Sequence, residues 1–353
     1  QHAGSSHNLP VGTGLTSATS CIYKVTVDSG LIGWGETNPI INLKFHRRLF
    51  DEKIRDRLCG VDVFDRNEIL QQLSQTFVPP IFSKSLLAGI DIACWDIIGK
   101  AVQQPVYNLL GGKVRDRAGI AYCIGIYEDV IARDKIQSIR DQGFKTIKTK
   151  GGGDVNDDIR RAWLCREWAG DEIELRIDMN QGYDITQAVR FLGSVESLNL
   201  EYVEQPILVN HFDQMATLIQ KSLTPIAINE DCYIPHNLLQ YILSNAIDLA
   251  VIDLDPLGGI SALVKMANIC QELGIPLAHH CGFDMGIKTA AILQVYAAKA
   301  ALSHPTDSTY MGHADDILVE KIPIIDGSFV ISDKPGLGIE VDPEKISRYA
   351  VTM

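Results

Sequence analysis

Long hydrophobic runs and an excess of positive charge are both missing from this 353-residue chain. No segment reaches the roughly 20 apolar residues that a membrane-spanning helix requires, and no signal peptide is visible, so a membrane partner is not expected. The chain carries 32 Lys and Arg residues against 44 Asp and Glu residues, for a net charge of −12. Since binding to phosphate backbones requires basic patches, this charge also disfavours a nucleic acid as partner.

Closely paired cysteines are absent as well. The eight cysteines are scattered, none belongs to a C-x-x-C pair, and several lie in apolar stretches. This pattern is typical of reduced core residues in a cytoplasmic protein, and it disfavours the alternative of a structural zinc site. The eight residues are Cys21, Cys59, Cys94, Cys123, Cys165, Cys232, Cys270 and Cys281.

A dinucleotide-binding loop is not evident either. The run Gly151-Gly152-Gly153 follows a predicted strand, but it lacks the G-x-G-x-x-G spacing that lets a backbone cradle a pyrophosphate. We interpret it as a flexible loop.

The first third of the chain has the pattern of an α+β domain. Apolar and polar residues alternate on both sides of Asp28-Ser29-Gly30, which predicts a hairpin with strands at Cys21–Val27 and Leu31–Trp34. Helical patterns follow, and Ser83 is the expected N-cap of the last helix. These helices are predicted over residues 42–58, 65–76 and 83–101.

From about residue 118, short strand-like runs alternate with helical stretches. Eight such strands in roughly 200 residues favour an α/β fold with a parallel (β/α)8-type barrel over an open sheet. The predicted strands are Ala118–Cys123, Thr146–Thr149, Glu174–Ile177, Leu200–Val203, Ile226–Ile228, Leu249–Ile252, Pro276–Ala278 and a weaker one near Ser308–Met311. We therefore expect a first domain over residues 1–115, a barrel over 116–322, and a C-terminal segment over 323–353 that returns to the first domain.

Three acidic residues, Asp178, Glu204 and Glu230, each follow an apolar run. Their spacing is regular, since 204 − 178 and 230 − 204 are both 26 residues, about one strand, one helix and two loops. Residues that end barrel strands converge at the barrel mouth, so these three carboxylates are predicted to hold one divalent cation. An all-oxygen set without histidine or cysteine favours Mg²⁺ over zinc. Asp231 is the competing third ligand, but Glu230 keeps the interval and the strand phase.

Two lysines, Lys148 and Lys150, alternate on one predicted strand and so point to one face. Mutual repulsion and desolvation would both lower their pKa values, and a lysine lowered in this way can act as a general base. Solvated lysines at a strand end are the ordinary alternative.

Asp253 and His280 end two later predicted strands. An aspartate bound to one imidazole nitrogen fixes the tautomer and raises the basicity of the other nitrogen. His280 is therefore a candidate second acid or base facing Lys150, with His279 as the alternative. The predicted catalytic set is Lys150, His280, Asp253 and Lys148.

Several motifs, taken together, resemble those of the enolase superfamily, in its mandelate racemase/muconate lactonizing enzyme family. The resemblance covers nearly the whole chain, and the Asp253–His280 pair is similar to that of the mandelate racemase-like subgroup. The motifs are Gly33-Trp34-Gly35-Glu36, Asn108-Leu109-Leu110-Gly111-Gly112, Lys148-Thr149-Lys150, Ile177-Asp178-Met179-Asn180, Tyr202-Val203-Glu204-Gln205-Pro206, Ile228-Asn229-Glu230, Leu257-Gly258-Gly259-Ile260 and Pro335-Gly336-Leu337-Gly338.

The resemblance implies a barrel covered by an α+β capping domain built from both termini, one Mg²⁺ per subunit, and abstraction of the proton alpha to a carboxylate. The substrate would be a small carboxylate, and we expect a homo-oligomer. Residues 1–14 are polar and glycine-rich, which suits a lid loop over the substrate.

The expected substrate contacts are Asn180, Tyr310 and Asp284. Racemases of this subgroup place a glutamate at the end of the eighth strand, and the segment Thr309-Tyr310-Met311-Gly312-His313 offers no such acid. Mandelate itself is therefore disfavoured as the substrate.

Three reactions share the predicted first step. Dehydration of an acid sugar is our first hypothesis, with stabilisation of the enediolate by Mg²⁺. The alternatives are a racemase or epimerase of a hydroxy or amino acid, in which Lys150 and His280 exchange one proton, and a lactone cycloisomerase. A catalytically silent barrel that serves as a binding protein is the hypothesis from another class, and it predicts the loss of strand-end groups that are present here.

Overall fold

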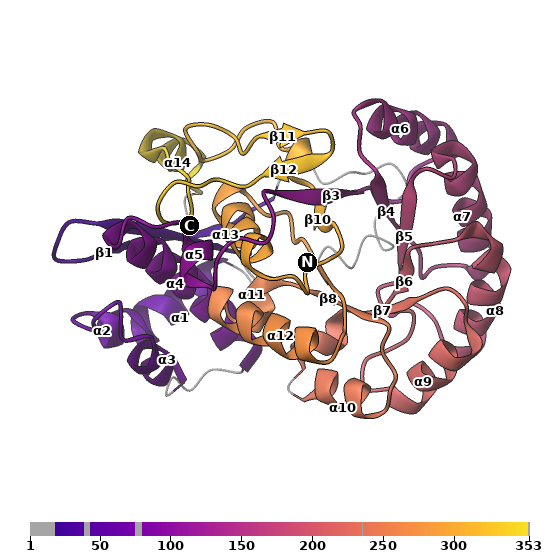
Figure 1. The fold of residues 1–353 in the computed structure, drawn as a ribbon, viewed down its shortest axis with the longest axis horizontal. Helices are drawn as coiled ribbons and strands as arrows, with labels where there is room; N and C mark the ends of the chain where they lie inside the picture. Colours follow the sequence, from indigo (N-terminus) through magenta and orange to yellow (C-terminus); the bar gives the residue numbers. More distant parts are fainter. Residues whose placement is uncertain (1–17, 39–42, 75–79, 235, 352–353) are drawn as a thin grey trace.

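The computed structural model describes residues 18–38, 43–74, 80–234 and 236–351. Figure 1 shows a barrel whose outer helices form a curved wall, with a smaller cap beside it and the C-terminal segment lying over their junction. The predicted lid over residues 1–14 lies outside the described residues. Among the described residues, no helix combines the length and the apolar character needed to cross a bilayer.

The cap consists of an antiparallel hairpin packed on helices. Strands β1 (Cys21–Thr26) and β2 (Ile32–Thr37) pair from Cys21↔Thr37 to Thr26↔Ile32, as the alternating pattern predicts. Helix α4 begins at Pro80, so Ser83 lies inside this helix and the prediction that it is the N-cap was wrong. The cap helices are α1 (Leu43–Lys53), α2 (Arg55–Leu58), α3 (Arg66–Ser74), α4 (Pro80–Ala101) and α5 (Val106–Leu109).

Two glycines in β2 let this strand lie directly against α4. A Cβ atom at Gly35 would come within 1.8 Å of the Gly89 carbonyl oxygen, and one at Gly33 would come within 2.1 Å of the Ala93 carbonyl oxygen. Only glycine allows such close backbone contact. This packing delivers the next residue, Glu36, to the barrel, where its carboxylate accepts the backbone N–H groups of Met285 and Lys288 at the start of helix α13 (Gly286–Ala298).

The barrel predicted from the sequence is confirmed. Strands β3 to β9 pair in parallel in chain order, and β10 returns to pair in parallel with β3. The strands are β3 (Arg117–Cys123), β4 (Thr146–Lys150), β5 (Glu174–Asp178), β6 (Tyr202–Glu204), β7 (Ile226–Ile228), β8 (Leu249–Ile252), β9 (Leu277–His279) and β10 (Thr306–Ser308). The connecting helices are α6 (Asp129–Asp141), α7 (Val155–Ala169), α8 (Ile185–Val195), α9 (Phe212–Lys221), α10 (Asn237–Leu243), α11 (Leu254–Leu257), α12 (Ile260–Glu272) and α13 (Gly286–Ala298).

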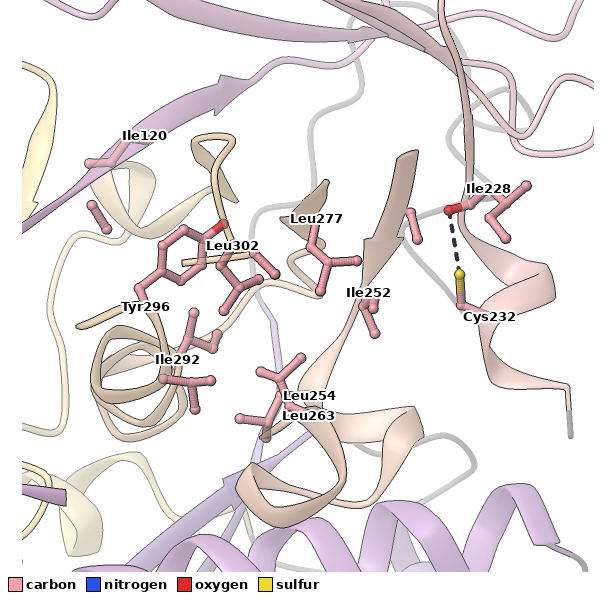
Figure 2. Close-up of a cluster of buried hydrophobic side chains, with 14 of the residues drawn as sticks. Ile120, Ile228, Cys232, Ile252, Leu254, Leu263, Leu277, Ile292, Tyr296 and Leu302 are labelled. Atoms are coloured by element: carbon pink, nitrogen blue, oxygen red, sulfur yellow. Dashed lines mark hydrogen bonds between the residues drawn. The ribbon is translucent and has the colours of Figure 1, made fainter. Parts of the chain in front are cut away.

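Side chains alternate between the two sides of the barrel wall. Figure 2 shows Ile252 and Leu277 on the outer side, among side chains of α11, α12 and α13 such as Leu254, Leu263 and Ile292. Full burial of one such side chain contributes roughly 1.5–3 kcal/mol. The inner side has its own small apolar cluster, formed by Tyr202, Ala227, Leu249, Val251 and Ala278. This period of two also directs the acidic and basic strand-end residues into the barrel mouth.

The eighth strand lies slightly earlier than predicted. The sequence pattern placed it near Ser308–Met311, but β10 covers Thr306–Ser308, and Tyr310–Gly312 form the short 3₁₀ helix η4. Because β10 begins at Thr306, Asp307 is part of the barrel strand, and it pairs with Ala121 of β3.

The C-terminal segment contacts both parts of the molecule. Strands β11 (Ile324–Ile325) and β12 (Ser328–Val330) form a hairpin, and β12 extends the sheet by antiparallel pairing with β3. Further on, the backbone N–H of Leu337 donates to Asp96 of α4, and helix α14 (Pro343–Tyr349) ends the described fold. The division into domains at residues 115 and 322 stays a prediction.

Candidate active site

Three charged residues end neighbouring strands in direct register. Lys150 of β4 pairs with Asp178 of β5, and Asp178 pairs with Glu204 of β6. Residues paired in this way in a parallel sheet point to the same side, so the three side chains form one layer at the mouth of the barrel. Lys148 and Arg176 are paired in the layer beneath.

The Lys150 ammonium lies against the carboxylate of Asp178. Its Nζ is 2.7 Å from Asp178 Oδ2 and donates to the Asn180 side-chain oxygen at 3.0 Å. The Asn180 amide in turn donates to Glu230 Oε1 at 3.4 Å. Asn180, which the sequence predicted to bind substrate, thus connects the base candidate to an expected metal ligand.

Lys148 is buried beneath this layer and pairs with three carboxylates. Its Nζ lies 2.6 Å from Glu204, 2.7 Å from Asp307 and 3.3 Å from Asp178. Arg176 continues the network, because its guanidinium is 2.9 Å from the other Asp307 oxygen. With 2% of its side chain exposed, Lys148 supports the site from below rather than facing a substrate.

The expected fall in the lysine pKa values is not found, and the direction is opposite. Burial lowers the pKa of Lys150, but the Asp178 carboxylate outweighs it and the net pKa is raised. Burial likewise lowers the pKa of Lys148, and Asp307, Glu204 and Asp178 together raise it well above its usual value. The neighbouring Lys148 does lower the pKa of Lys150, but the carboxylates that the next strands supply outweigh it.

The acidic groups at the mouth are crowded and incompletely paired. Burial and the adjacent Asp178 carboxylate raise the pKa of Glu204 well above its usual value, and the same two causes raise that of Glu230. Among the described residues, Glu204 Oε1 and Glu230 Oε2 are buried without a hydrogen-bond partner. Such buried oxygens are costly unless a cation or a donor meets them.

Asp231, the rival third ligand, is fully engaged elsewhere. One of its oxygens accepts hydrogen bonds from Gln205 Nε2 at 2.8 Å and from the Tyr241 hydroxyl at 2.7 Å. The other accepts from Asn237 Nδ2 at 2.6 Å and from the Asn210 backbone at 3.0 Å. Its carboxylate therefore holds the loop after β7 in place.

His280 also reaches the acidic cluster. Potential ligand atoms of Asp178, Glu204 and His280 all lie within 4.8 Å of one another, and Glu230 is not part of this group. The His280 Nδ1 atom lies 3.5 Å from Asp253 Oδ2, at the limit of a hydrogen bond. His279, the alternative, is fully buried on the other side of β9, where its Nε2 accepts the Leu254 N–H at 3.1 Å.

Two expected substrate contacts are occupied within the protein. The Tyr310 hydroxyl donates to Asp316 and accepts the Ile322 N–H, and its ring is buried against Phe329. We therefore withdraw Tyr310 as a substrate contact. Asp284 is 5% exposed and lies 2.8 Å from the ammonium of Lys288, which makes it part of a buried ion pair.

Three charged residues of this region are not among those predicted from the sequence: Asp307, Arg176 and Lys288. Asp307 lies in β10, which begins two residues before the predicted eighth strand. Arg176 lies in phase with Asp178 on β5, so the period of two could have found it. Lys288 had a weaker signal, a single charge in the apolar helix α13, all of whose residues are buried.

Comparison with known proteins identifies the chain. The barrel and the acidic residues at its strand ends are typical of enolase-like enzymes. Residues 132–345 match the family described as enolase C-terminal domain-like. Residues 4–111 match the N-terminal domain of the mandelate racemase/muconate lactonizing enzymes. The chain therefore belongs to the mandelate racemase/muconate lactonizing enzyme family of the enolase superfamily, and it is an enzyme of that superfamily.

Its relatives catalyse different overall reactions. The chain is 28% identical over 342 residues to N-succinyl-L-Arg/Lys racemase of Bacillus cereus, covering 94% of this chain and 90% of the relative. It is 32% identical over 274 residues to arabinonate dehydratase of Saccharolobus solfataricus, covering 74% and 71%. The structure of muconate cycloisomerase from Pseudomonas fluorescens superposes with a TM-score of 0.86 at 26% identity, covering 94% of each chain.

Proposed function

We propose that this chain is an Mg²⁺-dependent enzyme that removes the proton alpha to the carboxylate of a small acid, and that the overall reaction is dehydration of an acid sugar. The observation that carries the proposal is the placement of two proton-transfer groups beside one acidic cluster. Lys150 Nζ is 2.7 Å from Asp178, and a His280 ring nitrogen lies within 4.8 Å of both Asp178 and Glu204. A small acid bound over this cluster would be within reach of both groups.

The residues at the mouth fit Mg²⁺. The buried oxygens without partners on Glu204 and Glu230 are hard ligands of the kind that Mg²⁺ prefers. The cluster also has fewer cationic groups than carboxyl groups, three against five, so two carboxyl groups (5 − 3) lack a cationic partner that a bound ion could supply. The cationic groups are Lys148, Lys150 and Arg176, and the carboxylates are Asp178, Glu201, Glu204, Glu230 and Asp307.

Asp178, Glu204 and Glu230 would hold the ion. We keep Glu230 over Asp231 because both Asp231 oxygens are engaged, and over His280 because a carboxylate suits Mg²⁺ better than imidazole does. When bound, Mg²⁺ would supply positive charge that stabilises the enediolate of the substrate.

Lys150 would accept the α-proton. Burial and the nearby Lys148 ammonium both lower its pKa, and the Asp178 and Glu204 carboxylates are the groups that raise it. Neutralising these two carboxylates would remove the raising influence, so that Lys150 could be neutral and accept a proton.

His280 would complete the reaction. Asp253 would accept the Nδ1 proton of the imidazole and leave Nε2 free toward the substrate. As an imidazolium, His280 would protonate the β-hydroxyl, which departs as water and leaves an enol that becomes a 2-keto acid. Epimerisation is the second candidate, favoured by the same pair of bases, because Lys150 and His280 could exchange one α-proton in turn.

A direct test is incorporation of deuterium from D₂O into a panel of aldonates, hexarates and N-succinyl-L-arginine in the presence of Mg²⁺. Mass spectrometry would show loss of water for a dehydratase, and a deuterated epimer without loss of water for an epimerase. We expect loss of water from at least one acid sugar. No exchange with any member of the panel would contradict the proposed function.

Replacing Asp253 by asparagine is expected to impair the steps that need His280. The amide cannot fix the tautomer, and the corresponding change in a serine protease lowers turnover by about 10⁴. We expect water loss to fall by roughly 10²–10⁴, while exchange of the α-proton by Lys150 continues. Product formation is followed by mass spectrometry and exchange by proton NMR.

The matched control is Asp248→Asn, at the other end of the same strand. The Asp248 side chain accepts the backbone N–H of Ile226 in β7 at 2.8 Å, at the end of the barrel opposite the mouth. Loss of this carboxylate should therefore affect stability alone. Equal losses of water elimination and exchange in Asp253→Asn would contradict the assignment of the dyad.

A further inference from the structure

Lys288 places a single buried ammonium among acidic groups at the junction of barrel and cap. Its side chain is fully buried, and its Nζ lies 2.8 Å from Asp253 Oδ1 and 2.8 Å from Asp284 Oδ1. Burial lowers the pKa of Lys288, but Asp253, Asp284 and Asp255 raise it well above its usual value, so the group carries its charge. Lys288 therefore has no surface to offer a substrate, and its effect must pass through the groups it touches.

The ammonium leaves one oxygen of Asp253 for the imidazole. Asp253 Oδ1 receives Lys288 and also accepts the Asp255 N–H at 2.9 Å, while Oδ2 is the oxygen that faces His280 Nδ1. Burial raises the pKa of Asp253, but Lys288 is the first of the groups that bring it well below its usual value. Lys288 thus keeps this carboxylate charged and oriented, as an acceptor for the imidazole must be.

The same region is fixed by the cap. Glu36 at the end of β2 accepts the backbone N–H groups of Met285 at 2.7 Å and Lys288 at 2.8 Å. Asn38 donates its backbone N–H to Asp255 at 2.7 Å and its side-chain amide to Asp284 at 3.2 Å. The start of α13, and with it Lys288, is therefore held by both parts of the molecule.

We propose that Lys288 is a positioning residue that orients Asp253 toward His280 and thereby controls proton transfer at His280 without controlling it at Lys150. The proposal rests on the acid–base roles of the proposed function. The contrasting view is that Lys288 only neutralises buried carboxylates, in which case its loss would weaken every step together.

The test measures two steps in Lys288→Met. Loss of water, which needs His280 as the acid, is expected to fall by roughly 10- to 100-fold, no more than in Asp253→Asn. Exchange of the α-proton, which needs Lys150, is expected to change by less than about threefold. Both measurements use the acid that the wild-type enzyme dehydrates from the panel above. Equal losses of both steps would overturn the proposal.

Two further variants separate positioning from folding. Lys288→Met/Asp284→Asn removes one carboxylate together with the ammonium, so that the buried charge is less unbalanced, and it should still lose water elimination. Lys100→Met is the control, because Lys100, whose side chain is 25% exposed, forms an ion pair at 2.6 Å with the buried Asp96 within the cap. Melting temperature and calorimetric binding of Mg²⁺ alone report whether each variant is folded.

A measurement without substrate keeps the proposal distinct from the proposed function. Nitrogen-15 NMR of the His280 ring at fixed pH should show one tautomer, with the proton on Nδ1, in the wild-type enzyme and in Lys100→Met. In Lys288→Met we expect a mixture of tautomers. An unchanged His280 signal would overturn the proposal about Lys288. Failure of every acid in the panel to exchange its proton would contradict the proposed function, but not the proposal about Lys288.

Discussion

Lys150→Met is expected to lower the rate of α-proton exchange by roughly 10²–10⁴, the contribution of a positioned general base, while Mg²⁺ binding is largely retained. The side chain ends β4, and its Nζ contacts Asp178 and Asn180 rather than forming part of the carboxylate set. Methionine keeps most of the side-chain volume at this partly buried position and removes the amine. Exchange is measured by proton NMR in D₂O, and Mg²⁺ binding by calorimetry.

The control for this variant is Lys145→Met. Lys145 is an exposed lysine that directly precedes the same strand, so its loss should change neither measurement. If Lys150→Met exchanged the α-proton at the wild-type rate, Lys150 would be excluded as the base. Loss of Mg²⁺ binding together with exchange would instead indicate that the lysine maintains the structure of the carboxylate cluster.

Glu204→Gln is expected to remove both Mg²⁺ binding and turnover. Bound metal contributes several kcal/mol of charge stabilisation, which corresponds to a loss of at least about 100-fold in rate. The metal-free protein should keep its stability, since burial and Asp178 raise the pKa of Glu204 and glutamine resembles the protonated acid. Lys148 would also retain Asp307 at 2.7 Å and Asp178 at 3.3 Å.

Thermal unfolding with and without Mg²⁺ checks this prediction. The wild-type enzyme should melt at higher temperature with the ion, because a ligand that binds only the folded state stabilises it, and Glu204→Gln should not. Glu174→Gln is the matched control, since Glu174 is an exposed acid at the opposite end of β5. A normal Mg²⁺-induced shift in Glu204→Gln would contradict its assignment as a ligand.

The regular spacing of three acids made the barrel mouth predictable before the structure. One strand, one helix and two loops fill a nearly constant length of chain, so acids one repeat apart lie at or just after the ends of successive strands. Asp178 and Glu204 end β5 and β6, and Glu230 begins the 3₁₀ helix η3 (Glu230–Tyr233) that follows β7. The register Lys150↔Asp178↔Glu204 follows from the same regularity. Alternation of side chains then decides that these residues point inward, and this needs no knowledge of distant contacts.

Short or irregular elements were less predictable. β10 has three residues, too few for the alternation of Thr306-Asp307-Ser308 to stand out from the loop around it. Tyr310–Gly312 then form a 3₁₀ helix, and the Tyr310 hydroxyl donates to Asp316. The pKa directions of Lys148 and Lys150 were likewise wrong, because they depend on carboxylates from three other strands.

The sequence by itself determined the barrel, the family resemblance and the strand-end residues, because each depends on periodicity or on short motifs. Only the tertiary structure decided which carboxylates are free and which are engaged. Asp231 is adjacent to Glu230 in the chain, yet it is held by four donors from other segments, while Glu230 keeps a buried oxygen without a partner among the described residues. Lys288 similarly reaches Asp253 across 35 residues of sequence (288 − 253), since helix packing and not local pattern sets which buried charges meet.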